Sequence, residues 1–138
     1  MAREYLILDT SAYPLVIGVF QDFVPTLEEF KGWQKMMDAY HAQHDNYVLL
    51  LDFSKVTVSS IEYRLLTVKW SRENDDMFVR KNIKVVFYTP SLTTRVMMKA
   101  IQAMFRPKVK YVIVSSLQKG MTVAKQLLAE NRNVAAGK

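Results

Sequence analysis

The chain has 138 residues, half of them hydrophobic, and a net charge of +6, which suits one domain with a buried core. It has no cysteine, which excludes disulfides, a thiolate nucleophile and cysteine-based zinc sites, and its start lacks the pattern of a signal peptide. No apolar run approaches the roughly 18 residues of a membrane-spanning helix, so we expect a single cytoplasmic domain over residues 1–138 whose contact with any membrane is peripheral.

The charge is unevenly distributed along the chain. Residues 1–79 hold 7 basic and 12 acidic residues, a net −5, whereas residues 80–138 hold 12 basic residues and one acidic residue, Glu130, a net +11. A cationic half of this kind favours an anionic partner such as phosphate groups, an acidic protein surface, anionic lipid or nucleic acid. The alternative is that the basic half packs beside the acidic half and leaves its charged helix faces in solvent.

The beginning of the chain predicts a β-hairpin followed by a helix. Glu4–Asp9 and Leu15–Gln21 have the composition of strands, and the short segment between them contains a proline. A connection of that length suits a hairpin rather than a crossover, so the two strands should be antiparallel and near an edge of the sheet. Thr26 and Glu29 have the spacing of a capping box, which opens a helix extending to about His44.

The run Tyr47–Leu51 predicts the central strand. It is apolar without interruption, which is typical of a strand covered on both faces of a sheet. The pattern from Ser59 to Glu62 is a second capping box, which opens a helix extending to about Phe78. The polar stretch 71–76 is either a solvated face of this helix or a break in it.

The rest of the chain alternates strands with helices. Ile83–Thr89 and Lys110–Ser115 read as strands, and the helix between them ends before Pro107. A last helix begins after Ser116, and we expect the tail 131–138 to be frayed.

The predicted order of elements is therefore β-β-α-β-α-β-α-β-α. This order predicts an α/β fold with a single mixed β-sheet, in which an N-terminal antiparallel hairpin is followed by parallel strands, right-handed crossovers and packed helices. In open sheets of this kind, ligands tend to bind near the carboxyl ends of the parallel strands.

Together with this order, the segment Leu49–Glu62 (LLLDFSKVTVSSIE) resembles the STAS domain of anti-sigma-factor antagonists. That family has a buried strand, D-x-S-x-V, and then D-S-S-G opening a helix, and the matching residues here are Asp52, Ser54, Val56, Ser59 and Ser60. The chain has Val58 in place of the aspartate before the serines and Ile61 in place of the glycine after them. The resemblance implies a non-enzymatic regulatory or protein-interaction domain, and makes Ser59 and Ser60 candidates for phosphorylation by a partner kinase. The chain is more similar to divergent STAS-like proteins that share a fold with CRAL-TRIO lipid-binding domains, which implies binding of a lipid or small apolar anion as the alternative.

Hydroxyl side chains follow each of three predicted parallel strands. Besides Ser59-Ser60, the candidates for an anion-binding or ligand-binding rim are Lys55, Ser91, Thr93, Arg95, Ser116 and Lys119. Because the carboxyl ends of parallel strands meet at one edge of a sheet, these residues would surround helix amides that bind anions. The alternative is that each hydroxyl only caps its own helix.

Catalysis is not expected from this sequence. No G-x-S-x-G, G-x-G-x-x-G or P-loop pattern follows a strand. His41 and His44 lie near the end of the first helix, where their cationic forms would suit the helix C-terminus, and no third metal ligand accompanies them. We therefore expect a protein that is not an enzyme and has no cofactor and no metal.

Three classes of binding function remain. The first is a regulatory or protein-interaction domain, expected to form a homodimer because so short and apolar a chain would bury apolar surface against a second copy. The second is a lipid-binding or apolar-anion-binding protein with an adaptable wall of Met77, Met97, Met98, Met104 and Phe105, residues that would equally suit a core. Nucleic-acid binding is least favoured, because no aromatic-rich basic motif accompanies the charge.

Overall fold

The structure is a computed structural model that describes residues 3–56 and 60–136. Over these residues it contains five strands and four helices in the predicted order. Their bounds are β1 Leu6–Asp9, β2 Leu15–Phe20, α1 Leu27–Gln43, β3 Val48–Asp52, α2 Ile61–Arg80, β4 Lys84–Tyr88, α3 Leu92–Phe105, β5 Tyr111–Val114 and α4 Leu117–Ala136. No helix in this described part of the chain is long and apolar enough to cross a membrane.

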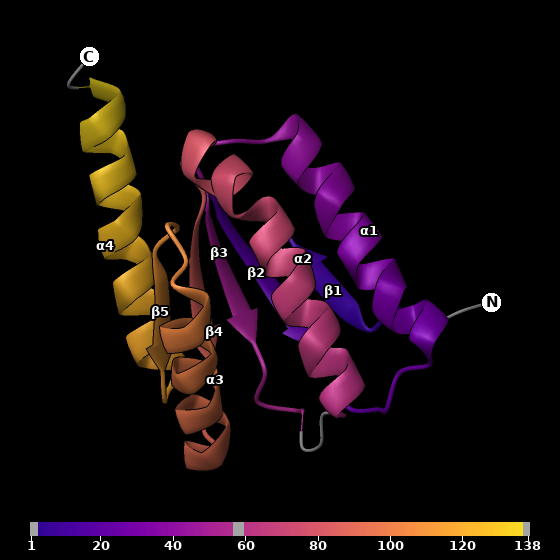
Figure 1. Cartoon of the computed structure of the whole chain (residues 1–138). Coiled ribbons are helices and arrows are strands. Elements are labelled where there is room, and N and C mark those ends of the chain that lie inside the picture. The colour runs from indigo at the N-terminus through magenta and orange to yellow at the C-terminus, as the bar shows by residue number, and fades with distance from the viewer. Residues whose placement is uncertain (1–2, 57–59, 137–138) are drawn as a thin grey trace.

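The strands form one mixed sheet in the order β1-β2-β3-β4-β5 (Figure 1). β1 is antiparallel to β2 and the other neighbours are parallel, so the predicted α/β fold with an N-terminal hairpin is confirmed. β3 lies at the centre, where Leu50 is opposite Ile17 of β2 and Val86 of β4. The residues from Val48 to Leu51 are all buried, which explains the uninterrupted apolar run in the sequence.

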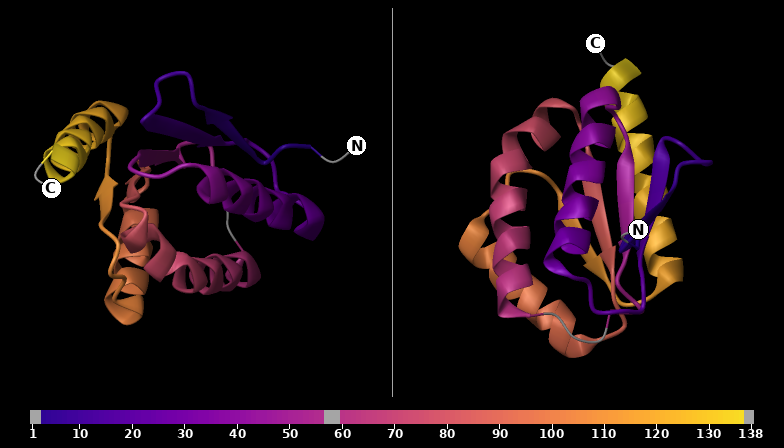
Figure 2. Two further views of the ribbon diagram at one scale, coloured as in Figure 1. Left: turned by 90° about the horizontal axis from the view of Figure 1, so that it is seen from above. Right: turned by 90° about the vertical axis from the view of Figure 1, so that its right-hand side faces the viewer.

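Helices cover both faces of the sheet, but unequally (Figure 2). Because β2 to β5 follow one another across the sheet in chain order, right-handed crossovers place α1, α2 and α3 on one face. Leu49 and Leu51 belong to the core on this face, whereas Val48 and Leu50 belong to the core under α4 on the other. The last of the three helices, α3, contacts β5 and α2, and the candidate site lies on its inner side.

α1 begins with the capping box expected from the sequence. The Thr26 hydroxyl accepts a hydrogen bond from the Glu29 amide at 3.1 Å, and the Glu29 carboxylate accepts one from the Thr26 amide at 2.8 Å. The same carboxylate pairs with the Arg3 guanidinium at 2.9 Å, and these hydrogen bonds, to Arg3 above all, lower the pKa of Glu29 to about 2. The fixed start of α1 directs Phe30 and Trp33 into the core.

α2 is one continuous helix through residues 71–76, so the polar stretch is a helix face and not a break. Within this stretch Asp75 is buried, and its carboxylate accepts hydrogen bonds from the backbone amides of Lys108 at 2.9 Å and Val109 at 3.1 Å. The neighbouring Asp76 is exposed and pairs with the Lys108 ammonium at 3.1 Å. The polar stretch therefore combines solvated residues with one carboxylate that holds the connection between α3 and β5.

The C-terminal segment differs from expectation. α4 continues to Ala136, so most of the segment 131–138, which we expected to be frayed, is helical, and residues 137–138 lie outside the described chain. Asn131 accounts for this, because its side chain is buried and its amide nitrogen donates to the carbonyl of Asn82 at 3.4 Å. A buried polar contact near the end of α4 ties the last turns to the rest of the fold.

Candidate functional site

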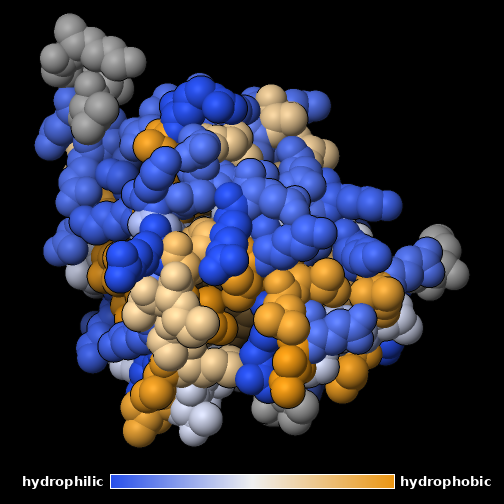
Figure 3. Space-filling model, in the orientation of Figure 1, coloured by the Kyte–Doolittle hydropathy of each residue, from blue (hydrophilic) through white to orange (hydrophobic). Residues whose placement is uncertain are grey.

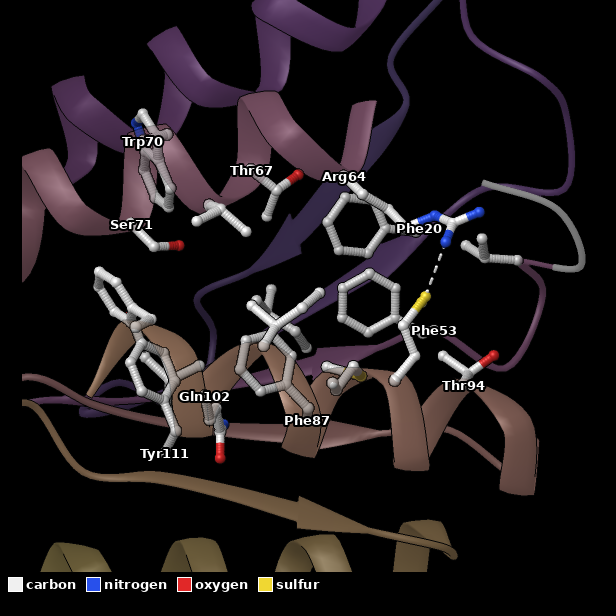
Figure 4. Close-up of a pocket in the computed structure, with 18 of the residues that line it drawn as sticks. Phe20, Phe53, Arg64, Thr67, Trp70, Ser71, Phe87, Thr94, Gln102 and Tyr111 are labelled. Atoms are coloured by element: carbon white, nitrogen blue, oxygen red, sulfur yellow. Dashed lines mark hydrogen bonds between the residues drawn. The ribbon is translucent and has the colours of Figure 1, made fainter. Parts of the chain in front are cut away.

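A cavity of about 430 Å³ lies between α2, α3 and the sheet (Figure 4). Its lining is mostly apolar, and its floor consists of Leu49, Leu51, Val85, Phe87 and Tyr111. These side chains come from β3, β4 and β5 and point to the face that carries three helices, because successive residues of a strand point to opposite faces. The sheet therefore provides a rigid apolar floor.

α2 contributes a wall that mixes polar and apolar side chains. Arg64, Thr67, Val68 and Ser71 line the cavity, and their spacing of three and four residues places them on one face of the helix. At a rise of about 1.5 Å per residue, Arg64 and Ser71 are about 10 Å apart along the axis of α2. Figure 4 shows them near opposite ends of the cavity. The cavity is therefore elongated, with a cation at one end and a hydroxyl at the other.

α3 contributes an apolar wall with the same helical spacing. The lining residues on its inner face include Thr94, Met97, Met98, Ile101 and Phe105. Met97, Met98 and Phe105 belong to the wall predicted for a lipid ligand, but the rest of that wall lies elsewhere. Met104 is 81% exposed, and Met77 packs against the core without lining the cavity. Met104 lies two turns after Met97 on nearly the same side of α3, but at the end of the helix, where its side chain remains in solvent.

α3 is held loosely against the rest of the domain. None of its residues is buried. The contacts that join it to α2 across the cavity include a hydrogen bond from the Arg64 guanidinium to the Met97 sulfur at 3.1 Å, and the Arg72 guanidinium lies 5.5 Å from the centre of the Phe105 ring. Because little apolar surface anchors α3, this wall of the cavity can move at a lower free-energy cost than the sheet can.

Two polar groups of the cavity lining lack partners. The Trp33 indole N–H and the Tyr111 hydroxyl are buried, and neither has a hydrogen-bond partner among the described residues. Burial raises the pKa of the Tyr111 phenol. Each unpaired buried polar group costs about 1–3 kcal/mol.

The size of the cavity has an energetic consequence. At about 24 cal/mol per Å³, a sealed and empty cavity of this volume would cost about 10 kcal/mol, which is comparable with the whole stability of a typical domain. Figure 3 shows that the space is instead a hollow that opens to the surface between α2 and α3, in a largely apolar region. The apolar lining is therefore accessible from outside the protein.

The predicted hydroxyl groups serve as helix caps. Ser60 accepts a hydrogen bond from the Tyr63 amide at 3.1 Å, Ser91 from the Thr94 amide at 3.2 Å, and Ser116 from the Lys119 amide at 3.2 Å. Ser59 lies outside the described residues. The starts of α2, α3 and α4 do lie at the same end of the domain (Figure 1), but each hydroxyl is engaged by the first turn of its own helix.

The remaining residues of the predicted rim do not form one site. Lys55 and Lys119 are exposed, and the Arg95 guanidinium donates to the carbonyl of Thr89 at 3.0 Å. Thr93 is brought to the cavity, whose lining also includes its neighbour Thr94. The site that the structure assembles is thus the cavity beneath α3.

Several residues of the cavity were not singled out from the sequence. They are Trp33, Arg64, Thr67, Ser71 and Tyr111. The available signal was the repeat of three and four residues from Arg64 to Ser71, which indicates a shared helix face. That face would be core or cavity depending on how closely α3 approaches the sheet, which is a tertiary property.

Among the described residues, no group of three or more His, Cys, Asp or Glu side chains could hold a metal ion.

Comparison of the chain with protein-family models, with curated proteins and with solved structures finds no match. Functional conclusions therefore depend on the geometry and chemistry of the cavity.

Proposed function

We propose that this domain acts by binding rather than by catalysis, and that its ligand is a small amphipathic molecule with an apolar chain and an anionic head. The observation that carries the proposal is the apolar cavity of about 430 Å³ between α2, α3 and the sheet. Cavities that hold small ligands measure about 300–1,000 Å³ and combine an apolar lining with a few placed polar groups. This function corresponds to the lipid or apolar-anion binding implied by the resemblance to the CRAL-TRIO-related proteins.

The volume of the cavity limits the size of the ligand. One water molecule occupies about 30 Å³, so the cavity holds on the order of 14 waters, or a ligand with a similar number of non-hydrogen atoms. Dodecanoate is of this size. The elongated shape suits a single extended chain rather than a fused ring system.

The charge at one end of the cavity orients the ligand. Arg64 lies at one end of the α2 wall, so its positive charge favours an anionic head there. The apolar chain would then extend between the sheet and the methionines of α3, whose flexible side chains adapt to different ligand shapes. A carboxylate at Arg64 with its chain over Phe87 is the pose that we propose.

The experiment uses the tryptophans of the protein as reporters. Trp33 and Trp70 are the two tryptophans of the chain, and both line the cavity. Octanoate, decanoate and dodecanoate are titrated while tryptophan fluorescence is recorded. Each methylene that enters the cavity should tighten binding about fourfold, since burying it is worth about 0.8 kcal/mol, until the cavity is full. Affinity that does not depend on chain length, or an unchanged spectrum, would contradict the proposal.

Two variants test whether the ligand binds in the cavity. Val68→Phe fills the space beside the floor and should abolish dodecanoate binding while keeping or raising the free energy of unfolding. The control is Val79→Phe, the same substitution near the other end of α2, at an exposed position that does not line the cavity. Arg64→Gln should weaken dodecanoate binding about tenfold and leave binding of the neutral dodecanol unchanged.

A STAS-like regulatory switch is a second candidate function, favoured by the position of Ser60. This serine is exposed and caps α2, where a phosphate would meet backbone amides and the positive end of the helix dipole. Mass spectrometry of the protein isolated from its native cells should then find phosphate on Ser60 and not on the similar cap Ser91. Light scattering tests the homodimer that we expect for such a regulatory domain.

A further inference from the structure

The helix α3 exposes large apolar side chains on the side where a surface helix is normally polar. Its inner face lines the cavity, yet its outer face carries Leu92 and Val96, which are 67% and 58% exposed, and Met104 near the end of the helix is 81% exposed. Large apolar side chains on a helix are normally buried against another element. In the isolated domain none of its residues is buried, so α3 lacks part of the environment that its sequence suits.

The apolar surface continues across the mouth of the cavity. On the other side of the hollow, α2 exposes Ile61 and Leu65. Figure 3 shows apolar surface over α3 and the beginning of α2, with the hollow between them. We define Ile61, Leu65, Leu92, Val96 and Met104 as the mouth surface. An exposed patch of this kind marks a surface that contacts another molecule or a membrane.

The charge on the α3 side of the mouth surface is positive. α3 contains Arg95 and Lys99 and no acidic residue, and Arg106 and Lys108 follow it. Lys99 is exposed and lies within one helical turn of Val96, on the outer side of the helix. From Arg80 onward the chain has one acidic residue, Glu130, which lies on α4. The partner of this surface should therefore present both apolar groups and negative charges.

We propose that α3 and the mouth surface dock on an anionic lipid bilayer. An amphipathic helix with exposed Leu, Val and Met and with Lys and Arg beside them lies in the membrane interface, where the apolar residues enter the acyl region and the cations meet lipid phosphates. The charge complementarity selects this partner over a second copy of the chain, because two such surfaces facing each other would bring like charges together.

This docking goes beyond the proposed ligand binding, and it would give the ligand a route into the cavity. The cavity opens on the same surface, between α2 and α3. With α3 in the interface, the mouth would face the acyl chains, so an amphipathic ligand could move between the bilayer and the cavity without crossing water. Because none of its residues is buried, α3 could shift during this transfer.

The test measures co-sedimentation of the full chain with vesicles. Phosphatidylcholine vesicles with phosphatidylserine should bind the protein, vesicles of phosphatidylcholine alone should bind it weakly, and added salt should reduce binding to the anionic vesicles. Lys99→Glu should lower the partition coefficient about 30-fold, and Val96→Glu should lower it at least about tenfold.

Each variant has a matched control. Lys125→Glu makes the same change of charge on α4, on the opposite face of the sheet, and Val79→Glu places a glutamate at an exposed apolar position at the far end of α2. Both should keep wild-type binding to anionic vesicles. Circular dichroism checks that all four variants are folded.

Three results would overturn the docking proposal. The first is no binding to anionic vesicles at low salt, and the second is equal loss of binding in the variants and their controls. The third is a dimer in light scattering that Val96→Glu converts to a monomer without any vesicle binding by the wild type, because a second copy would then cover α3. Val68→Phe should bind vesicles normally although its cavity is filled, so failure of docking and failure of ligand binding are distinguished.

Discussion

His41 makes the stability of this fold depend on pH. The residue lies in the last turn of α1 and is only 1% exposed. One ring nitrogen, Nδ1, is hydrogen-bonded to the Tyr47 hydroxyl, whereas Nε2 has no partner among the described residues. Burial, and then the positive charge of Lys81, lower the pKa of His41 from 6.5 to about 4. From its position in the sequence, His41 was expected to suit the helix C-terminus as a cation. In the structure it is instead a buried residue that is neutral at pH 7.

The sign and size of the effect follow from this shift. Between about pH 6.5 and about pH 4 the unfolded chain binds a proton at His41 that the folded chain does not, so the free energy of unfolding falls as the pH falls. Proton linkage with these two pKa values predicts a loss of about 2 kcal/mol between about pH 7 and about pH 5. Glu29, with a pKa lowered to about 2, stays ionised in the folded protein throughout this range.

Urea denaturation followed by circular dichroism at several pH values measures the effect. The control is His41→Asn, whose side-chain oxygen can accept the hydrogen bond of the Tyr47 hydroxyl but does not titrate. The variant should be less stable than the wild type at neutral pH, because the smaller side chain leaves space in the core. Its stability should nevertheless change little between about pH 7 and about pH 5. Equal pH dependence of the two proteins would refute the assignment to His41.

Two further substitutions test the buried polar groups. Asp75→Ala leaves the amides of Lys108 and Val109 without their acceptor and should lower the free energy of unfolding by about 2–3 kcal/mol, whereas Asp76→Ala breaks an exposed ion pair and should cost less than about 1 kcal/mol; similar losses in urea denaturation would argue against this role of Asp75. Tyr111→Phe removes a hydroxyl that has no partner in the described chain and should keep the stability or raise it by about 1 kcal/mol. A clear decrease in the melting temperature would mean that the hydroxyl is hydrogen-bonded.

The parts of the fold that sequence patterns predicted are those determined by neighbouring residues. The capping box of Thr26 and Glu29 requires only residues three apart, and the structure contains it. The central position of β3 was visible because a strand covered on both faces has no polar side. The start of α2 was predicted one residue early, because its cap is Ser60 and not Ser59 of the expected capping box, and Ser91 caps α3, as the alternative to an anion-binding rim had it.

The sequence by itself determined the order of elements, the mixed sheet and the helix starts, since backbone propensity, period and capping act over a few residues. Only the tertiary structure decided that a cavity remains between α2, α3 and the sheet, so that Met97 lines it while Val96 is exposed. The same apolar helix closely packed would have been a core helix with no site. The distance between a helix and a sheet depends on all the side chains between them, and no local pattern encodes that sum.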